Sequence, residues 1–329
     1  MTCIGMLIPP RLRRSLFTAA DLTELGKLGR VVSHDGELPA TVKQAIAILR
    51  EADIAIGSWS TVHAGTPGLL AECPRLGLWM HVAGSVKQFF NEYSAGRKLV
   101  VASCKKAIAD CVAEMALAEM ICGLRRLWPN AKANRGAPSG APPGIKVLET
   151  ATVGIIGASE VGKRLLELLR PFGCRVLLYD PYCDSAQAQD LGAHEKVDDL
   201  LALCRRSDAI TLHTPLLPAT RRLLRAEHFQ AMADDAIFIN TARGGCVDEP
   251  ALLAELEKGR LYAFLDVTDP EPAAPDSPLR RLPNVVLTSH IAGPATFNMG
   301  RQCVADVRAF LAGGQPTSVV TAEMLERIA

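Results

Sequence analysis

The chain has 329 residues, 49% of them apolar, and a formal net charge of +1. A chain of this length is expected to form two domains, each with a buried core. Because 36 Lys and Arg are balanced by 35 Asp and Glu, the composition offers no strongly basic face to a nucleic acid or a membrane surface. We therefore expect a small-molecule ligand, with no nucleic-acid and no membrane partner.

The amino-terminal residues do not have the order of a secretory signal peptide. In MTCIGMLIPPRLRRSLF the basic residues follow a short apolar stretch, whereas a signal peptide begins with its basic residues. No window reaches about 18 uninterrupted apolar residues, so a membrane span is not expected. The ten cysteines contain no C-x-x-C pair. We expect them to be reduced thiols in a cytoplasmic protein.

The first third of the chain alternates strand-like and helical patterns. Short apolar runs that end in small or turn residues predict strands over 53–59, 75–84 and 98–103. Apolar residues at helical spacing predict a long, largely buried helix over 110–128. The segment 129–144 is rich in Pro, Gly and Ala, and we expect a loop and the change of domain near it.

After residue 150 strands and helices alternate regularly. The patterns predict strands over 152–157, 174–180, 209–214, 236–242, 263–267 and 285–290, and helices over 160–171, 197–205, 225–232, 249–258 and 295–312. This alternation predicts an α/β fold with a doubly wound parallel sheet covered by helices on both faces. The last helix and the tail to 329 are expected to return to the first domain.

The segment TVGIIGASEVGKRLL resembles the strand, turn and helix that hold a dinucleotide. Gly157 would make the tight turn, and Gly162 would let the helix pack close to the strand. The amides around Glu160 and Val161 would point at a phosphate from the helix amino terminus. Ser159 replaces the second glycine of the G-x-G-x-x-G pattern, and its hydroxyl can donate to a phosphate oxygen. Taken alone, the pattern also fits a plain strand-to-helix turn.

Asp180 supports the dinucleotide interpretation. It ends the next expected strand, 18 residues after Gly162, where an acid accepts hydrogen bonds from ribose hydroxyls and repels a 2′-phosphate. No arginine follows it in YDPYCD, so NAD is favoured over NADP. The alternative is a turn residue before Pro181.

Three later strand ends carry residues whose chemistry is complementary. Arg243 offers a fork of donors to a carboxylate and the adjacent carbonyl oxygen. His290 can accept the hydroxyl proton as hydride leaves C2, and return it in the reverse direction. Glu271, if hydrogen bonded to the far nitrogen of His290, would fix its tautomer and favour the imidazolium. Each residue alone also fits a turn or surface position, but together they predict chemistry on a 2-hydroxy or 2-oxo acid.

Six segments in order resemble the D-isomer-specific 2-hydroxyacid dehydrogenase family: TVGIIGASEVGKRL, YDPY, SDAITLHTPLLPATRRLL, INTARGGCVDEPALLAEL, LDVTDPEP and LTSHIAGP. The resemblance implies two Rossmann-like domains. An NAD-binding domain over 125–294 would be inserted into a smaller, flavodoxin-like substrate domain made of 1–124 and 295–329. It also implies NAD as cofactor, a homodimer, and hydride transfer between nicotinamide C4 and C2 of a D-2-hydroxy acid.

The resemblance assigns roles to single residues. Arg243, Glu271 and His290 take the places of the family's catalytic arginine, glutamate and histidine. The implied cofactor contacts are Asp266 at the nicotinamide carboxamide, Thr214 and Pro215 on the adenosine side, Thr241 and Ala242 near the nicotinamide, and Gly293.

A segment of the first domain, HVAGSVKQF, resembles the family's carboxylate-binding loop. The resemblance places Ala83, Gly84 and Ser85 at the substrate carboxylate, together with Arg243. Small residues suit such a loop because close backbone approach leaves little room for side chains. Ile108 stands where the family often has an asparagine.

The sequence is also compatible with other functions of this fold. An NAD(H)-sensing, corepressor-like binding protein would share the fold and the cofactor while catalysing little or nothing. A relative of formate dehydrogenase is disfavoured by Glu271, because that subgroup pairs its histidine with an amide. The sequence does not identify the preferred acid.

Overall fold

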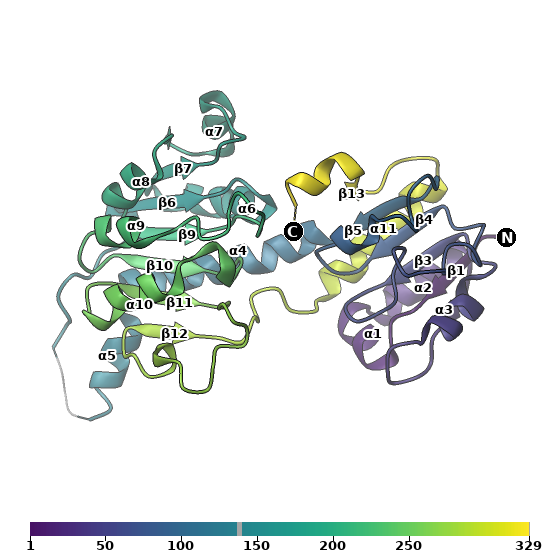
Figure 1. The fold of residues 1–329 in the computed structure, drawn as a ribbon, viewed down its shortest axis with the longest axis horizontal. Coiled ribbons are helices and arrows are strands. Elements are labelled where there is room, and N and C mark those ends of the chain that lie inside the picture. The colour runs from purple at the N-terminus through teal and green to yellow at the C-terminus, as the bar shows by residue number, and fades with distance from the viewer. Residues whose placement is uncertain (137–139, 329) are drawn as a thin grey trace. The chain divides into compact units, whose positions relative to one another are not determined.

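The computed structural model describes residues 1–136 and 140–328, and the chain folds as two compact α/β units (Figure 1). Unit 1 comprises Met1–Ile108 and Pro294–Ala329, and unit 2 comprises Ala109–Gly293. The expected α/β fold is confirmed. Among the described residues, no helix has both the length and the apolar character needed to cross a membrane.

Unit 1 is built on a six-stranded sheet of order β13-β5-β4-β3-β1-β2. The strands are β1 (Cys3–Met6), β2 (Arg30–Ser33), β3 (Ile54–Gly57), β4 (Leu78–His81), β5 (Val100–Ser103) and β13 (Val319–Val320). All pair in parallel except β13, which pairs antiparallel with β5. The helices are α1 (Pro10–Leu16), α2 (Ala19–Leu28), α3 (Val42–Leu49) and α11 (Phe297–Leu311).

The start of unit 1 departs from the sequence analysis, which places no element before residue 53. β1 and β2 are only four residues long, and prolines at 9 and 10 follow β1 closely. Runs this short carry little periodicity, so their strand character depends on pairing, β1 with β3 and β2 with β1. The strands expected at 53–59, 75–84 and 98–103 form as the shorter β3, β4 and β5.

Unit 2 contains a fully parallel seven-stranded sheet of order β12-β11-β10-β9-β6-β7-β8. Its strands are β6 (Thr152–Ile156), β7 (Arg175–Tyr179), β8 (Glu195–Lys196), β9 (Ala209–Leu212), β10 (Ile237–Asn240), β11 (Tyr262–Leu265) and β12 (Val285–Leu287). Its helices after α4 (Lys105–Leu124) are α5 (Leu127–Ala133), α6 (Glu160–Leu169), α7 (Ser185–Leu191), α8 (Leu200–Arg206), α9 (Ala226–Ala231) and α10 (Glu249–Glu257). Every strand expected after residue 150 forms, whereas β8 and α7 are additional elements.

The long helix α4 (Lys105–Leu124) begins and ends earlier than the expected helix 110–128. Arg126 adopts a left-handed conformation with φ of 53°, which ends α4 and lets α5 begin. The expected loop 129–144 therefore starts inside a helix, and its residues 137–139 lie outside the described residues. The division between the units falls within α4 rather than at 125, because most of this helix packs on the sheet of unit 2.

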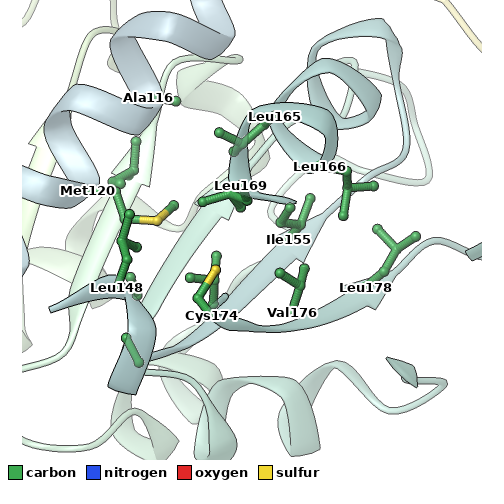
Figure 2. Close-up of a cluster of buried hydrophobic side chains, with 14 of the residues drawn as sticks. Ala116, Met120, Leu148, Ile155, Leu165, Leu166, Leu169, Cys174, Val176 and Leu178 are labelled. Carbon is green, nitrogen blue, oxygen red and sulfur yellow. The ribbon is translucent and has the colours of Figure 1, made fainter. Parts of the chain in front are cut away.

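One core of unit 2 lies between α4, α6 and the sheet. Figure 2 shows side chains from the two helices and from the regions of β6 and β7 converging: Ala116, Met120, Leu165, Leu166, Leu169, Ile155, Cys174, Val176 and Leu178. Further along α4, a Cβ on Gly123 would lie 2.9 Å from Cγ2 of Ile237 and from Cε2 of Phe264. This close approach fixes α4 directly on β10 and β11.

Candidate active site

The turn after β6 requires glycine at two positions. Gly157 has φ of 100°, a conformation that L side chains rarely adopt. A Cβ on Gly162 would lie 2.1 Å from the carbonyl oxygen of Gly157, so only glycine lets the first turn of α6 approach the turn. Glu160 and Val161 occupy that first helical turn. This arrangement directs the amino terminus of α6 toward the carboxyl end of β6, where phosphates bind in such folds.

Ser159 is compatible with this turn. Its φ of −64° and ψ of 177° are extended values open to any residue, and it is the N-cap of α6. Its Oγ accepts a hydrogen bond from the amide of Gly162 at 3.4 Å. Because the hydroxyl accepts rather than donates here, its proton remains available to donate to a phosphate oxygen.

Asp180 connects the end of β7 to the glycine turn. Its Oδ2 accepts from the amide of Ala158 at 2.6 Å, and its Oδ1 accepts from the amide of Tyr182 at 2.7 Å. Asp180 therefore keeps a half-buried carboxylate in a fixed orientation beside the turn. This is the position from which an acid contacts the ribose of a dinucleotide.

Unpartnered polar atoms gather at the ends of β9 and β10. The hydroxyls of Thr214 and Thr241 and the Nδ1 atom of His213 are buried and have no hydrogen-bond partner among the described residues. The other ring nitrogen of His213 lies 2.9 Å from Oγ1 of Thr211, and burial lowers the pKa of His213 to about 3. Buried polar atoms normally have partners. These orphaned atoms, beside a turn that a Cβ would block, therefore fit a polar ligand such as a dinucleotide.

Arg243 follows β10 in an ordered segment. Its Nη1 donates to the carbonyl of Ala242 at 2.7 Å, and Asn240 holds the segment by donating to the carbonyl of Arg243 and accepting from the amide of Ala242. A Cβ on Gly244 would lie 2.1 Å from the carbonyl of Thr268. The segment that carries Arg243 therefore packs against the segment after β11 that leads to Glu271.

His290 and Glu271 form a direct pair. Nδ1 of His290 lies 2.6 Å from Oε1 of Glu271, with both side chains about half exposed. His290 has φ of 57°, which is uncommon for a residue with a side chain. Such a backbone conformation persists where the surrounding contacts determine it, and it is frequent at functional sites.

Asp266 holds the segment that carries His290. Its Oδ1 accepts from the hydroxyl of Thr288 at 2.5 Å and from the amide of Ile291 at 2.8 Å, and its Oδ2 accepts from the amide of Ala292 at 2.9 Å. The carbonyl of Asp266 accepts from the amide of His290 at 2.8 Å. The carboxylate is 1% exposed, so these donors replace its water shell. Gly293 ends the same segment.

The expected carboxylate loop belongs to unit 1 and follows β4. Ala83 is fully buried, and its carbonyl accepts from the amide of Cys104 at 3.0 Å. Ser85 is exposed, and Gly84 is partly exposed. A Cβ on Gly84 would lie 3.5 Å from Cδ1 of Ile108. The side chain at position 108 therefore borders the loop with a methyl group rather than an amide.

Sequence reasoning missed several residues that organise the site. Asn240 and Thr288 lie inside the segments INTARGGCVDEPALLAEL and LTSHIAGP, but the resemblance assigned neither of them a role. Glu119 offers a signal, because it lies on the apolar face of α4 and is 8% exposed. An acid among core positions of a predicted buried helix is the feature that could have identified it.

Comparison with known proteins defines the family. The model of the D-isomer specific 2-hydroxyacid dehydrogenase NAD binding domain matches residues 117–292, which is more than half of the chain. The chain belongs to the D-isomer specific 2-hydroxyacid dehydrogenase family. The matched part of the chain is the NAD-binding domain of this family, so NAD(H) is the cofactor.

Individual members of the 2-hydroxyacid dehydrogenase family are similar over most of the chain. D-3-phosphoglycerate dehydrogenase of Methanocaldococcus jannaschii is 31% identical over 256 residues, which are 76% of this chain and 47% of that protein. Glyoxylate/hydroxypyruvate reductase B of Escherichia coli is 33% identical over 265 residues, 79% of this chain and 80% of that protein. The chain thus aligns with about half the length of the phosphoglycerate dehydrogenase. A phosphoglycerate oxidoreductase from Rhizobium etli shares the fold, with a TM-score of 0.80, 24% identity, and coverage of 98% of this chain and 99% of that one.

Proposed function

We propose that the chain is an NAD-dependent D-2-hydroxyacid dehydrogenase. It would transfer a hydride between nicotinamide C4 and C2 of a D-2-hydroxy acid or the matching 2-oxo acid. The observation that carries this proposal is the 2.6 Å contact between His290 and Glu271. A histidine oriented by a carboxylate at a strand end is suited to moving a proton while hydride is transferred.

The proton would move through Nε2 of His290, because Nδ1 is engaged by Glu271. Bound NADH would supply the hydride for reduction of a 2-oxo acid. In that direction His290, as imidazolium, would donate its proton to the forming alkoxide oxygen. During oxidation the neutral ring accepts the hydroxyl proton. Glu271 stabilises the positively charged ring in both directions and keeps the same tautomer.

Arg243 would bind the substrate. Its guanidinium can engage the carboxylate and the carbonyl oxygen through separate N–H groups. This contact orients the carbonyl and stabilises the charge that develops on its oxygen. We assign Ala83, Gly84 and Ser85 to the same carboxylate, which they would hold through backbone amides.

Different residues of the chain would contact different parts of the cofactor. Gly157, Ser159 and the first turn of α6 would hold the pyrophosphate, and Asp180 the ribose. Thr214 and Pro215 would border the adenosine half. Thr241, Ala242 and Asp266 would border the nicotinamide, with Gly293 at the end of the segment that Asp266 holds.

The experiment that tests this function begins with fluorescence titration of purified protein with NADH and NADPH. The same sample is then given a panel of 2-oxo acids that includes glyoxylate, hydroxypyruvate and larger acids, and NADH oxidation is followed. The expected result is NADH binding at submicromolar to roughly tens of micromolar concentration, with weaker NADPH binding and turnover of at least one acid.

Two results would change the assignment. Tight NADH binding without turnover of any acid would favour an NAD(H)-sensing, corepressor-like protein of the same fold. Absence of binding to either nucleotide would overturn both the dehydrogenase assignment and the NAD(H)-sensing alternative. The variant H290N separates chemistry from binding, because it should bind NADH like the parent while losing turnover.

We also propose that the active form is a homodimer. Around the α4–α5 junction, unit 2 exposes large apolar side chains: Ile121, Leu127, Trp128, Ile145 and Val147. Trp128 and Pro129 line a small pocket together with Pro283 and with Val286 of β12. Exposed apolar groups of this kind favour burial against another protein surface. Sedimentation analysis should give a dimer, and W128E should shift it toward the monomer.

We place the protein in the cytoplasm. All ten cysteines fall within the described residues, and no two of them form a disulfide. Reduced thiols are typical of that compartment. Fractionation of cells that express the protein would test this assignment.

A further inference from the structure

Glu119 is an acid within an apolar helix face. It lies on α4 between positions whose side chains belong to the buried core, Ala116 and Met120. Glu119 is 8% exposed, and its Oε2 has no hydrogen-bond partner among the described residues. An unpaired buried carboxyl group destabilises a fold, so its presence requires an explanation.

The contact at Gly123 places Glu119 near the end of β11. Gly123 touches Phe264 of β11, and Glu119 lies one helical turn before it on the same face. Asp266 follows two residues after Phe264. The charge of Asp266 acts on Glu119, so the two acids are neighbours at the carboxyl end of β11.

Glu119 is an uncharged acid at neutral pH. Burial first, and the negative charge of Asp266 second, raise its pKa to about 8. The thiol of Cys122 is a titratable group close to it on the same helix. The other elements packed around this part of α4 contribute apolar side chains, namely Ile237 and Ile239 of β10 and Leu165 of α6. Nearer the start of the helix, Asp110 forms an ion pair with Arg164.

We propose that Glu119 is a positioning residue whose neutral form lets the Asp266 carboxylate hold the segment 288–292, and with it His290, in place. Asp266 supplies both of its oxygens to that segment. A second negative charge nearby, in a buried site, would repel the carboxylate and weaken these hydrogen bonds. The role given to His290 rests on the proposed function.

The first test follows the carboxyl proton directly and needs no substrate. Infrared spectra of the protein without nucleotide should show a protonated carboxylic acid whose band disappears with a midpoint near pH 8. E119Q should lack this band. D266N should retain this band, with its midpoint shifted to lower pH.

The midpoint of the band falls in D266N because, without the repelling charge of Asp266, Glu119 loses its proton more readily. E114Q is the matched control: Glu114 lies on the same helix but is exposed, so its removal should leave the band unchanged. A band that persists in E119Q, or a midpoint that is the same in D266N, overturns the proposal.

The second test measures the consequence for the site. Between pH 7 and about pH 9.5, the dissociation constant of NADH should rise roughly tenfold in the parent protein and remain nearly constant in E119Q. Oxidation of a 2-hydroxy acid should show the same divergence in kcat, because weaker hydrogen bonds from Asp266 would displace the segment that carries His290. Identical pH dependence in both proteins overturns the positioning role.

The two tests also separate this inference from the proposed function. If NADH binding diverges as expected while no 2-hydroxy or 2-oxo acid is turned over, the dehydrogenase assignment fails and the link between Glu119 and the Asp266 segment stands. If turnover occurs with equal pH dependence in parent and E119Q, the dehydrogenase assignment stands and the link fails.

Discussion

Nδ1 of His290 lies 2.6 Å from Oε1 of Glu271, although the two residues belong to different strand ends. The segment of His290 is held by Asp266, and the segment after β11 that leads to Glu271 is packed against Gly244. The geometry of the pair therefore depends on contacts made by residues that do not themselves touch the imidazole ring.

Replacing Glu271 by glutamine should lower kcat for reduction of a 2-oxo acid roughly 100-fold, within the range that general acid–base catalysis contributes. An amide does not stabilise the imidazolium as a carboxylate does, so proton donation becomes harder. NADH affinity, measured by fluorescence, should change little. D276N is the control, because Asp276 is an exposed acid on the same connection. Equal kcat values for E271Q and D276N would refute the role of Glu271.

Replacing Gly162 by alanine should weaken NADH binding at least about tenfold and lower the melting temperature, because overpacking is costly. The added Cβ would lie 2.1 Å from the carbonyl of Gly157, so the turn and the helix must separate. The control is G26A, which adds a methyl group to a helix where nothing lies within 4 Å. Unchanged NADH affinity in G162A would contradict the assignment of this turn to the pyrophosphate.

Replacing Ser159 by glycine should change stability by only a few tenths of a kcal/mol, since glycine is an acceptable N-cap. S159A should cost about 1 kcal/mol because it removes the hydroxyl that caps α6. If the hydroxyl also contacts a phosphate, NADH affinity should fall in both variants. Chemical denaturation and NADH titration of the pair measure the two effects separately.

Replacing Asp180 by alanine should reduce the preference for NADH over NADPH by roughly tenfold or more. The carboxylate that repels a 2′-phosphate is lost, and the amides of Ala158 and Tyr182 lose their acceptor. Titration with both nucleotides gives the ratio of dissociation constants. D184N is a suitable comparison, because Asp184 is a nearby exposed acid that caps α7. An unchanged ratio in D180A would argue against contact with the ribose.

The stability of E119Q relative to the parent should depend on pH. Below about pH 4.5 Glu119 is protonated in both the folded and the unfolded chain and has no pH-dependent effect. As pH rises, the unfolded chain releases this proton while the folded chain keeps it, so the parent loses stability by up to about 1.4 kcal/mol per pH unit. The loss should level off above pH 8, where the folded chain also releases the proton.

Denaturant unfolding at intervals from pH 5 to 9 measures this difference. E119Q does not titrate, so the advantage of E119Q over the parent should grow between these limits and then stay constant. A constant difference across the whole range would show that Glu119 has the same pKa in both states, contrary to its burial beside Asp266.

The amino-acid sequence by itself determined the local features of this protein. Gly157 and Gly162 follow from the chemistry of a tight strand-to-helix turn, and Asp180 from its spacing after that turn. The chemical types of Glu271 and His290 indicated a proton-transfer pair. The strands after residue 150 were predictable because apolar periodicity and turn residues are encoded over a few neighbouring positions.

The tertiary structure decided which distant groups meet. Asp266 holds the backbone of residues 291 and 292, Asp180 holds the amide of residue 158, and Glu119 lies beside Asp266. None of these contacts follows from local spacing, because each joins elements that are brought together only when the sheet is assembled and α4 packs on it. The same holds for β1 and β2, whose four-residue runs become strands through pairing with their neighbours.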